Sequence, residues 1–310
     1  MARRTTPQRL GATTGTSRLH HTLKNLLAYY DTEYLSHKAP STQKQQRGIH
    51  QIINQTLGPV HLKDLNPELL RAWRDTIAAT HAPGTVRRYY SALAAPLRVA
   101  IEDLEWLSEN PLRKVRKPAE SPGRTRYLSP EERERLLEAC QQSGSPHLYT
   151  IVCVALSTGA RRGEILGLTW PLVDFQQQQI RIGRSKNGDR RSVPLVGLGL
   201  EALKAHRAKY PKATGLLFPC ATGHRPMFVQ HPFETARRRA GLEDFHFHDL
   251  RHTFASYMAM SGASLLELAA LLGHRDLDMV QRYAHLTNSH LNGIVAKMNQ
   301  SFLGEERGTR

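Results

Sequence analysis

Hydrophobic residues recur at helical spacing through the first third of the chain. The first stripe runs from Leu23 to Tyr34, and an isoleucine-rich stripe follows it. Asn66 and Pro67 suit the N-cap and first position of a third helix, and a fourth stripe comes after it. Residues 19–112 are therefore predicted to form a compact all-α domain. The stripe positions are Leu23, Leu26, Leu27, Tyr30, Tyr34, Ile49, Ile52, Ile53, Leu57, Leu93, Leu97, Ala100 and Leu104.

The pattern changes in the second part of the chain. Ser129-Pro130-Glu131-Glu132 reads as a capping box with proline at the first helical position. Between residues 174 and 195 apolar and polar residues alternate, as in half-buried strands, and Asn187-Gly188 between the two arms is a strong hairpin-turn signal. Helical patterns flank this hairpin and continue to Phe302. The sequence predicts a mainly α protein with a small antiparallel β-sheet.

The predicted organisation has five parts. Residues 1–18 form a basic flexible tail, residues 19–112 the helical domain, residues 113–126 a basic linker, residues 127–300 a mixed α/β domain, and residues 301–310 a second flexible tail.

The net charge of the chain indicates which class of molecule it binds. The 310 residues include 43 Lys and Arg against 27 Asp and Glu, which gives a net charge of +16 and a pI of about 10.1. This excess indicates a polyanionic partner, most simply nucleic acid, with an acidic membrane surface as the alternative. Apolar runs such as residues 151–156 are far shorter than the ~20 residues a bilayer requires. No apolar segment typical of a signal peptide follows the N-terminal arginines.

The three cysteines, Cys140, Cys153 and Cys220, are widely spaced and include no CxxC pair. This pattern fits a reducing cytoplasm and predicts neither a disulfide framework nor a zinc site. We expect Cys140 and Cys153 to be plain core residues.

Basic residues in two places are candidates for phosphate contact. The linker sequence RKVRKPAESPGRTR is strongly basic, and the fourth predicted helix carries an arginine pair; in both cases simple solvation is the alternative. The candidates are Arg87, Arg88, Arg113, Lys114, Arg116, Lys117, Arg124 and Arg126. Binding driven by such charges should weaken steeply with salt.

An arginine pair follows the end of an apolar helix in the second predicted domain. The helix stops at Gly159, and Arg161 and Arg162 come almost directly after it. A guanidinium presents a planar fork that grips phosphate oxygens in pairs. A surface arginine pair behind a helix cap is the alternative.

A histidine and an arginine share a predicted helix face further along. His248 and Arg251 are three residues apart, so a ring nitrogen and a guanidinium converge on one point. His248 and His252 have the four-residue spacing of a zinc pair, but HExxH is absent and no third ligand is obvious.

Two further residues complete the candidates. Tyr283 follows the Leu-Leu-Gly-His274 string by nine residues, and its polar neighbours indicate that it need not be buried. A lone tyrosine on an apolar helix is more often a core residue. Lys186 adjoins the Asn-Gly turn, where it could reach into a groove or could simply be solvated.

Taken in order, these features resemble the tyrosine recombinase (phage integrase) family. The matching strings are TGARRGEIL, the SKNG hairpin followed by RRSVPL, HDLRHTFAS, LLGH, and the tyrosine nine residues later. The resemblance spans residues 127–297, and the first domain is similar to the family's helical core-binding domain. The region ahead of it looks too short for the extra arm-binding domain that many phage integrases carry. The matching catalytic positions are Arg161, Lys186, His248, Arg251, His274 and Tyr283.

The resemblance implies a site-specific recombinase that cuts and rejoins DNA through a 3′-phosphotyrosine. Tyr283 would be the nucleophile. Arg161 and Arg251 would clamp the non-bridging oxygens, and His274 would donate a further hydrogen bond.

It also implies the proton transfers. His248 would orient the site and accept or relay the tyrosine proton, and Lys186 would protonate the leaving 5′ oxygen. Glu164 would bind one of the site arginines and hold it in position. Neither a metal nor another cofactor, and no ATP, is expected.

The expected partners are double-stranded DNA and other copies of the chain. Four protomers would assemble on paired sites, with an apolar C-terminal stripe docking either on its own domain or in trans. A type IB topoisomerase-like enzyme and a DNA-binding regulator without catalysis are the alternative functions. The stripe comprises Leu291, Ile294, Val295, Met298 and Phe302.

Overall fold

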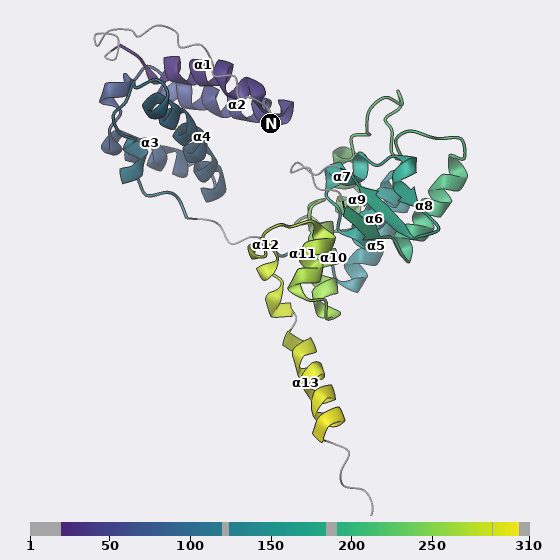
Figure 1. Ribbon diagram of the computed structural model, residues 1–310. Helices are drawn as coiled ribbons and strands as arrows, with labels where there is room; N and C mark the ends of the chain where they lie inside the picture. Colours follow the sequence, from purple (N-terminus) through teal and green to yellow (C-terminus); the bar gives the residue numbers. More distant parts are fainter. Residues whose placement is uncertain (1–19, 120–123, 184–190, 287, 304–310) are drawn as a thin grey trace, which may run out of the picture. The chain divides into compact units, whose positions relative to one another are not determined.

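The computed structural model describes residues 20–119, 124–183, 191–286 and 288–303 (Figure 1). The chain divides into two compact units, residues 1–122 and 123–310. Each unit is described by itself below.

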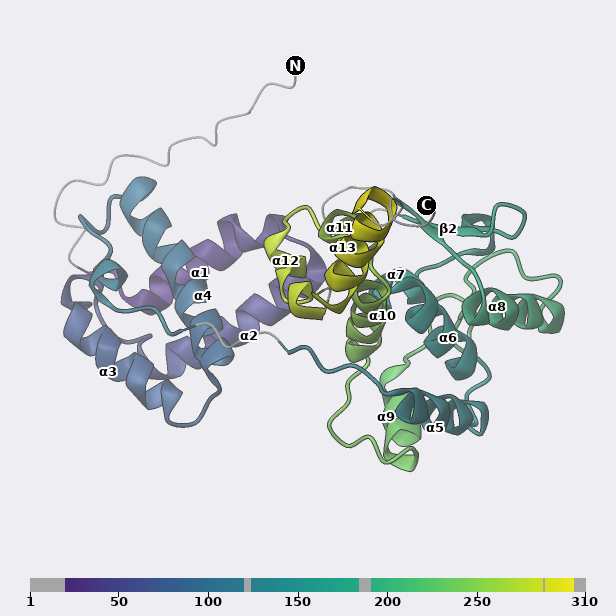
Figure 2. The same cartoon turned by 90° about the horizontal axis from the view of Figure 1, so that it is seen from below.

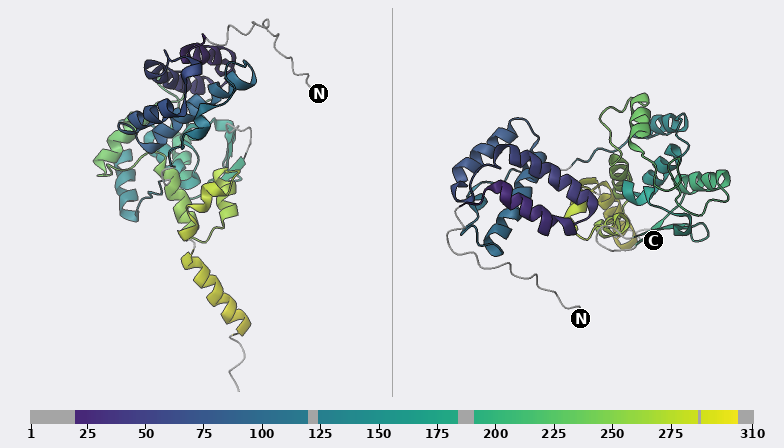
Figure 3. Two further views of the ribbon diagram at one scale, coloured as in Figure 1. Left: turned by 90° about the vertical axis from the view of Figure 1, so that its left-hand side faces the viewer. Right: turned by 90° about the horizontal axis from the view of Figure 1, so that it is seen from above.

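The described part of the first unit is helical throughout. Its long helices are α1 (Leu23–Glu33), α2 (Pro40–Thr56), α3 (Pro67–Ala78) and α4 (Pro83–Glu102). The predicted cap of α3 is confirmed, since the Asn66 side chain accepts a hydrogen bond from the Leu69 backbone N–H at 2.9 Å. Most residues of the predicted stripes form one core, and α4 contacts the other three helices (Figure 3). Tyr30 lies in a smaller cluster with Leu35 and Val99. Ile52 is an exception, because 39% of its side chain is exposed.

Short 3-10 turns complete this unit at Leu35–His37, Leu62–Asp64 and Pro111–Lys114. The last of them corrects the predicted start of the linker. Leu112 and Val115 are buried in the core of the first unit, and the Tyr90 hydroxyl donates to the Leu112 carbonyl at 2.7 Å. The first residues of the basic stretch therefore pack on the helices, because two apolar side chains are interspersed among the charges.

Helices also dominate the second unit. They are α5 (Pro130–Gln141), α6 (Leu148–Thr158), α7 (Arg162–Leu166), α8 (Leu198–Lys209), α9 (Gln230–Arg239), α10 (Asp249–Met260), α11 (Leu265–Leu272), α12 (Asp278–Gln281) and α13 (Asn288–Leu303), with 3-10 turns at Trp170–Leu172 and Ala284–Leu286. The predicted capping box at Ser129 is confirmed. Helix α13 extends three residues into the predicted C-terminal tail. No described helix has both the length and the hydropathy needed to cross a bilayer.

Helix α6 lies at the centre of this unit. Its residues 151–154 are all fully buried, and it packs against α5, α8 and α10 (Figure 2). A helix that is apolar all round is expected in such a place. It includes Cys153, which is buried as predicted, as is Cys140 on α5.

A three-stranded antiparallel sheet joins the same core. Its order is β1 (Val173–Asp174), β2 (Gln179–Ile182) and β3 (Arg191–Pro194). Ile180 lies opposite Val193, and both are buried, as the alternation predicted. The predicted mainly α fold with a small antiparallel sheet is confirmed; the Asn187-Gly188 turn lies outside the described residues.

Candidate active site

Two helices end in a left-handed glycine just before a predicted catalytic side chain. Helix α6 stops at Gly159 (φ 60°), two residues ahead of Arg161, and α11 stops at Gly273 (φ 65°), directly ahead of His274. Glycine tolerates this conformation because it has no Cβ. At Gly273 a Cβ would also lie 2.7 Å from a guanidinium nitrogen of Arg191. Each glycine therefore ends its helix and fixes the position of the candidate catalytic residue that follows it, Arg161 or His274.

Arg251 ties these two turns to helix α10. Its side chain is 4% exposed and donates to the Gly159 carbonyl and to the Leu272 carbonyl, each at 2.8 Å. A terminal nitrogen of the same guanidinium lies 2.6 Å from Nε2 of His274. Burial lowers the pKa of Arg251 to about 10, and the charge of Arg161 acts in the same direction. The group remains cationic at neutral pH.

The contact with Arg251 fixes the proton on the His274 ring. A guanidinium has only donors, so Nε2 of His274 must accept and Nδ1 carries the hydrogen. No described residue accepts from Nδ1, which is buried. Burial, followed by the charges of Arg251 and Arg161, lowers the pKa of His274 to about 4. A neutral ring therefore keeps one unused donor beside two cations.

Glu164 is the carboxylate between two arginines. It accepts from the Arg161 backbone N–H at 2.8 Å and from the Arg161 guanidinium at 3.1 Å. Arg191, at the start of β3, meets both of its oxygens, at 3.2 and 2.8 Å. Burial alone raises the pKa of Glu164, but the bonds from Arg191 and Arg161 outweigh it, so the pKa is lowered overall. Arg162 turns away, to the Gln230 side chain on α9 at 2.7 Å.

Arg191 also reaches the turn before His274. Its Nε donates to the Leu271 carbonyl at 3.1 Å, so one side chain links β3, α7 and the end of α11. Sequence reasoning missed this residue. Its only signal was its place in the RRSVPL string, where two adjacent arginines cannot be told apart by spacing.

Replacing Arg191 by methionine is expected to destabilise this unit strongly. The change removes both Arg191 donors from the largely buried Glu164 carboxylate, which keeps only its bonds from Arg161, and breaking a buried ion pair costs about 3–5 kcal/mol. Arg181→Met on β2 is the matched control, since Arg181 is 61% exposed and 3.7 Å from Asp174. Its cost should stay below about 1 kcal/mol. Urea unfolding measures both; equal values would show that the Arg191 network adds no stability.

Tyr283 is buried, a question that its polar neighbours in the sequence left open. Its side chain is 2% exposed and packs with Leu272 and Val280 of the neighbouring helices. The phenol lies within hydrogen-bonding distance of Nδ1 of His252. Burial raises the pKa of Tyr283, although the charges of Arg282 and Arg251 oppose the rise. The polar neighbours in sequence face other directions and did not reveal this packing.

His252, and not His248, is the ring at the phenol. The two imidazoles are one helical turn apart on α10 and meet edge to face at 5.1 Å between centroids. Burial, and secondly the charge of Arg251, lowers the pKa of His248. Sequence reasoning weighed His252 only as a zinc ligand. Among the described residues there is no group of three or more His, Cys, Asp and Glu side chains that could hold a metal.

Helix α11 contacts both α10 and α12 (Figure 2). Arg251 lies on α10, and His274 and Tyr283 follow α11 and α12, whereas Arg161 caps α7. Arg161, Arg251 and His274 form one contiguous polar cluster with Glu164 and Arg191, and Tyr283 joins α10 beside it. Lys186 lies outside the described residues.

Comparison with known proteins identifies the family. The profile described as the phage integrase family matches residues 126–290. The chain belongs to the phage integrase family. It is 32% identical to the integrase of Salmonella phage P22, covering 71% of this chain and 59% of that protein. It is 30% identical to the tyrosine recombinase XerD of Caulobacter vibrioides, covering 80% and 85%.

Solved structures show that this integrase-family protein shares their fold. A lambda integrase dimer bound to a COC′ core site matches with a TM-score of 0.74 at 21% identity, covering 86% of this chain and 97% of that one. The Tn1549 transposon integrase in complex with circular intermediate DNA gives 0.73 at 21% identity, covering 88% and 99%. The chain spans about half to three-fifths of the length of several curated relatives, including the P22 integrase and the shufflon-specific DNA recombinase of Escherichia coli.

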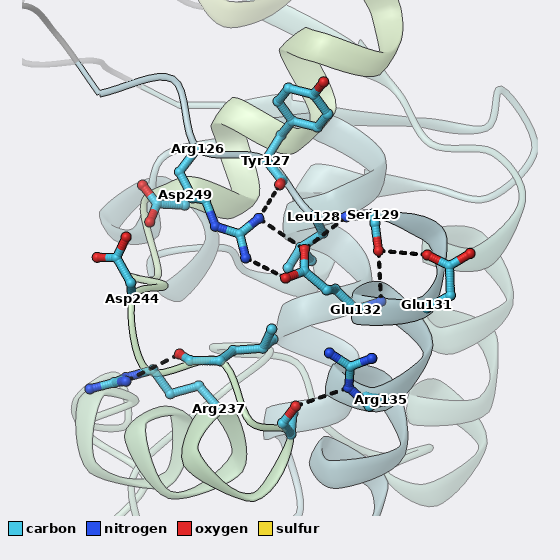
Figure 4. A network of polar contacts seen from close by, with 12 residues as sticks. Arg126, Tyr127, Leu128, Ser129, Glu131, Glu132, Arg135, Arg237, Asp244 and Asp249 are labelled. Carbon is cyan, nitrogen blue, oxygen red and sulfur yellow. Dashed lines mark hydrogen bonds and ion pairs between the residues drawn. The ribbon is translucent and has the colours of Figure 1, made fainter.

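Two predicted DNA contacts of this integrase-family protein are occupied by carboxylates. Arg126 donates to the Glu132 carboxylate at 2.9 Å and also to the Tyr127 carbonyl (Figure 4). Arg124 bonds Asp244 at 2.9 Å and Asp249 at 3.1 Å. Sequence charge alone could not show this pairing, because the partners lie up to 125 residues away. Their charges are compensated, so we expect them to add little to phosphate binding.

The remaining candidates differ in exposure. Arg88, Arg113, Arg116 and Lys117 are exposed, and Lys114 lies 3.3 Å from Glu109. Arg87 is half-buried and donates to the Pro118 carbonyl at 3.4 Å. A role of these side chains in DNA contact stays a prediction.

Proposed function

We propose that the protein is a tyrosine-type, site-specific DNA recombinase that cuts and rejoins strands through a covalent 3′-phosphotyrosine. The observation that carries this proposal is the junction at Arg251. One buried guanidinium joins the Arg161 turn, the His274 turn and the helix against which Tyr283 packs. Such a set of fixed donors suits an anion that gains charge during reaction.

The chemistry follows from these groups. A phosphodiester gains negative charge on its non-bridging oxygens when a nucleophile attacks phosphorus. Arg161 and Arg251 would bind those oxygens, and His274 would supply a further donor. The Tyr283 oxygen forms the new bond to phosphorus while the bond to the 5′ oxygen breaks.

Proton balance and resealing need no cofactor. The leaving 5′ oxygen takes a proton, for which Lys186 is our proposed donor, and His248 is our proposed acceptor of the tyrosine proton. The phosphotyrosine keeps the energy of the broken bond, so a 5′ hydroxyl from another strand can attack it without ATP. Two arginines and a lysine supply the charge that a metal would otherwise provide. Adduct formation should therefore persist in excess EDTA.

Covalent capture tests the function. The probe is a pool of duplexes tiled across the DNA that flanks the coding sequence, with a single nick at successive positions. A nick just beyond the cleaved bond lets the short 5′-hydroxyl fragment diffuse away and traps the adduct. Protein joined to a 3′ end after denaturation supports the proposal. Its absence across the pool favours a non-catalytic regulator, and relaxation of plasmids that lack such sites favours a topoisomerase-like enzyme.

We also propose that α13 docks on a neighbouring protomer during synapsis. Val295, Met298 and Phe302 repeat at helical spacing and are 51, 49 and 84% exposed. A lambda integrase tetramer bound to a Holliday junction has the same fold, with a TM-score of 0.74. The side chains of Leu291 and Ile294 lie outside the described residues.

Charging this stripe should abolish assembly and spare single-site binding. We expect Met298→Asp with Phe302→Asp to lose complexes of paired sites in gel shifts, because burying two carboxylates is unfavourable. Asn299→Asp with Ser301→Asp adds the same charge to exposed polar positions of α13 and should have little effect. Paired-site complexes that survive truncation before Met298 would refute the docking.

A further inference from the structure

The contact between Tyr283 and His252 links the segment that follows α12 to helix α10. Tyr283 follows the four-residue helix α12, whereas His252 lies on α10, one residue after Arg251. Both side chains are at least nine-tenths buried, at 2 and 9% exposure. The phenol meets Nδ1 of the ring, whose plane is tilted 43° from that of the tyrosine.

We propose that His252 is a positioning residue, whose Nδ1 accepts a hydrogen bond from the Tyr283 phenol and holds the nucleophile of the same chain beside Arg251 before DNA binds. The proposal rests on the proposed function, in which Tyr283 is that nucleophile.

The protonation states support this direction of the hydrogen bond. Burial, and secondly the charge of His248, lowers the pKa of His252 to about 4, so the ring is neutral at pH 7. Burial raises the pKa of Tyr283, so the phenol keeps its proton. A neutral imidazole has one acceptor and one donor nitrogen. The phenol can therefore donate to Nδ1 while Nε2 carries the ring hydrogen.

This arrangement leaves the tyrosine oxygen usable. When O–H is directed at Nδ1, the lone pairs of the same oxygen remain free for attack on phosphorus. The hydrogen bond fixes the phenol relative to α10, and α10 carries Arg251, which binds the two glycine turns. This one hydrogen bond therefore holds the nucleophile at a fixed position relative to the donors that would bind the phosphate.

The backbone hydrogen bonds of Tyr283 with other described residues are local. Its N–H donates to the Val280 carbonyl at 2.9 Å, and its carbonyl accepts from the Leu286 N–H at 3.0 Å. The ring belongs to an apolar cluster with Leu268, Leu272 and Val280. Apolar contacts retain a ring but do not direct its hydroxyl, so the directional part of the positioning falls to His252.

Two substitutions of His252 distinguish a residue that only positions the phenol from one that accepts its proton. His252→Asn keeps an oxygen acceptor close to the position of Nδ1 but cannot be protonated at working pH. His252→Leu keeps bulk and removes the acceptor. His224→Leu is the matched control, since His224 is exposed in the loop between α8 and α9. Circular dichroism checks folding, and His252→Gln, whose amide reaches the Nε2 position instead, replaces the leucine variant should that one unfold.

The first readout needs no DNA. Tetranitromethane nitrates accessible tyrosines, and mass spectrometry of the full-length protein follows Tyr283 at fixed pH. One lost hydrogen bond corresponds to roughly a three- to tenfold shift in population. His252→Leu should therefore nitrate faster at Tyr283 by about that factor, whereas His252→Asn and His224→Leu should match the parent protein. The second readout is adduct formation on the nicked duplexes, which should fall in the leucine variant and be preserved in the asparagine variant.

Two results would overturn the proposal. Unchanged nitration in His252→Leu would show that the ring does not hold the phenol. Adduct loss in His252→Asn equal to that in His252→Leu, with Tyr283 still shielded, would make His252 a proton acceptor instead. If the parent protein forms no adduct on any duplex, the proposed function fails, while the nitration comparison still decides the role of His252.

Discussion

Tyr283→Phe is expected to abolish covalent protein–DNA adducts and to leave duplex binding nearly unchanged. The substitution removes one oxygen and keeps the ring that fills the cluster around Leu272 and Val280. Loss of the hydrogen bond to His252 should lower the free energy of unfolding by only about 1 kcal/mol. Without the phenolic oxygen no bond to phosphorus can form, so adducts should fall to background.

Denaturing gels of the nicked duplexes measure the adducts, and gel shifts at fixed salt measure binding. Tyr257→Phe is the matched control, because it removes the same atom from the same unit. The Tyr257 hydroxyl donates to the Leu128 carbonyl at 3.0 Å, away from the arginine cluster. That variant should form adducts like the parent protein. Adducts that survive Tyr283→Phe would assign the nucleophile to another side chain.

Local features of the fold were predictable because their causes are local. The cap at Asn66 and the capping box at Ser129 depend on residues three positions apart, and both occur as predicted. The glycines of the TGAR and LLGH strings end helices in a conformation that other residues resist. The arginine and histidine that follow them could therefore be placed at helix ends from sequence alone.

Contacts over long sequence distances could not be predicted in the same way. Glu164 was expected to support an arginine, but its strongest partner is Arg191, 27 residues away on a strand. Which of two adjacent arginines faces inward depends on the strand's register, and the hairpin's turn residues do not determine that. The family resemblance supplied the catalytic set and Glu164, but not the bonds between Glu164 and Arg191.

The charges near a residue in the sequence did not reveal its burial or its bonding partners. Tyr283 stands among polar residues and is nonetheless 2% exposed. Arg124 and Arg126 were grouped with the linker as phosphate contacts, yet they bond carboxylates of the second unit. A count of charges along the chain cannot distinguish a cation held by a distant acid from one that is free for DNA.

Arg251→Lys is the other change with a large expected effect. Lysine keeps the charge but has no planar fork, so it cannot donate to the Gly159 and Leu272 carbonyls and reach His274 at once. Removing one donor to a developing oxyanion lowers rates by roughly 10²–10³. We expect a loss of at least that size in adduct formation, with duplex binding changed far less.

Arg162→Lys tests whether this loss is specific to the fork at Arg251. Arg162 follows Arg161 directly but bonds Gln230 on α9, outside the cluster, so its replacement should leave adduct formation near the parent level. Single-turnover adduct formation at saturating protein separates the chemical step from binding. If Arg251→Lys cleaves like the parent, a point charge is enough and the three hydrogen bonds of Arg251 are only structural. If both variants lose activity equally, the loss is not specific to the guanidinium fork of Arg251, and the junction at Arg251 no longer explains how the two glycine turns and Tyr283 act on one phosphate.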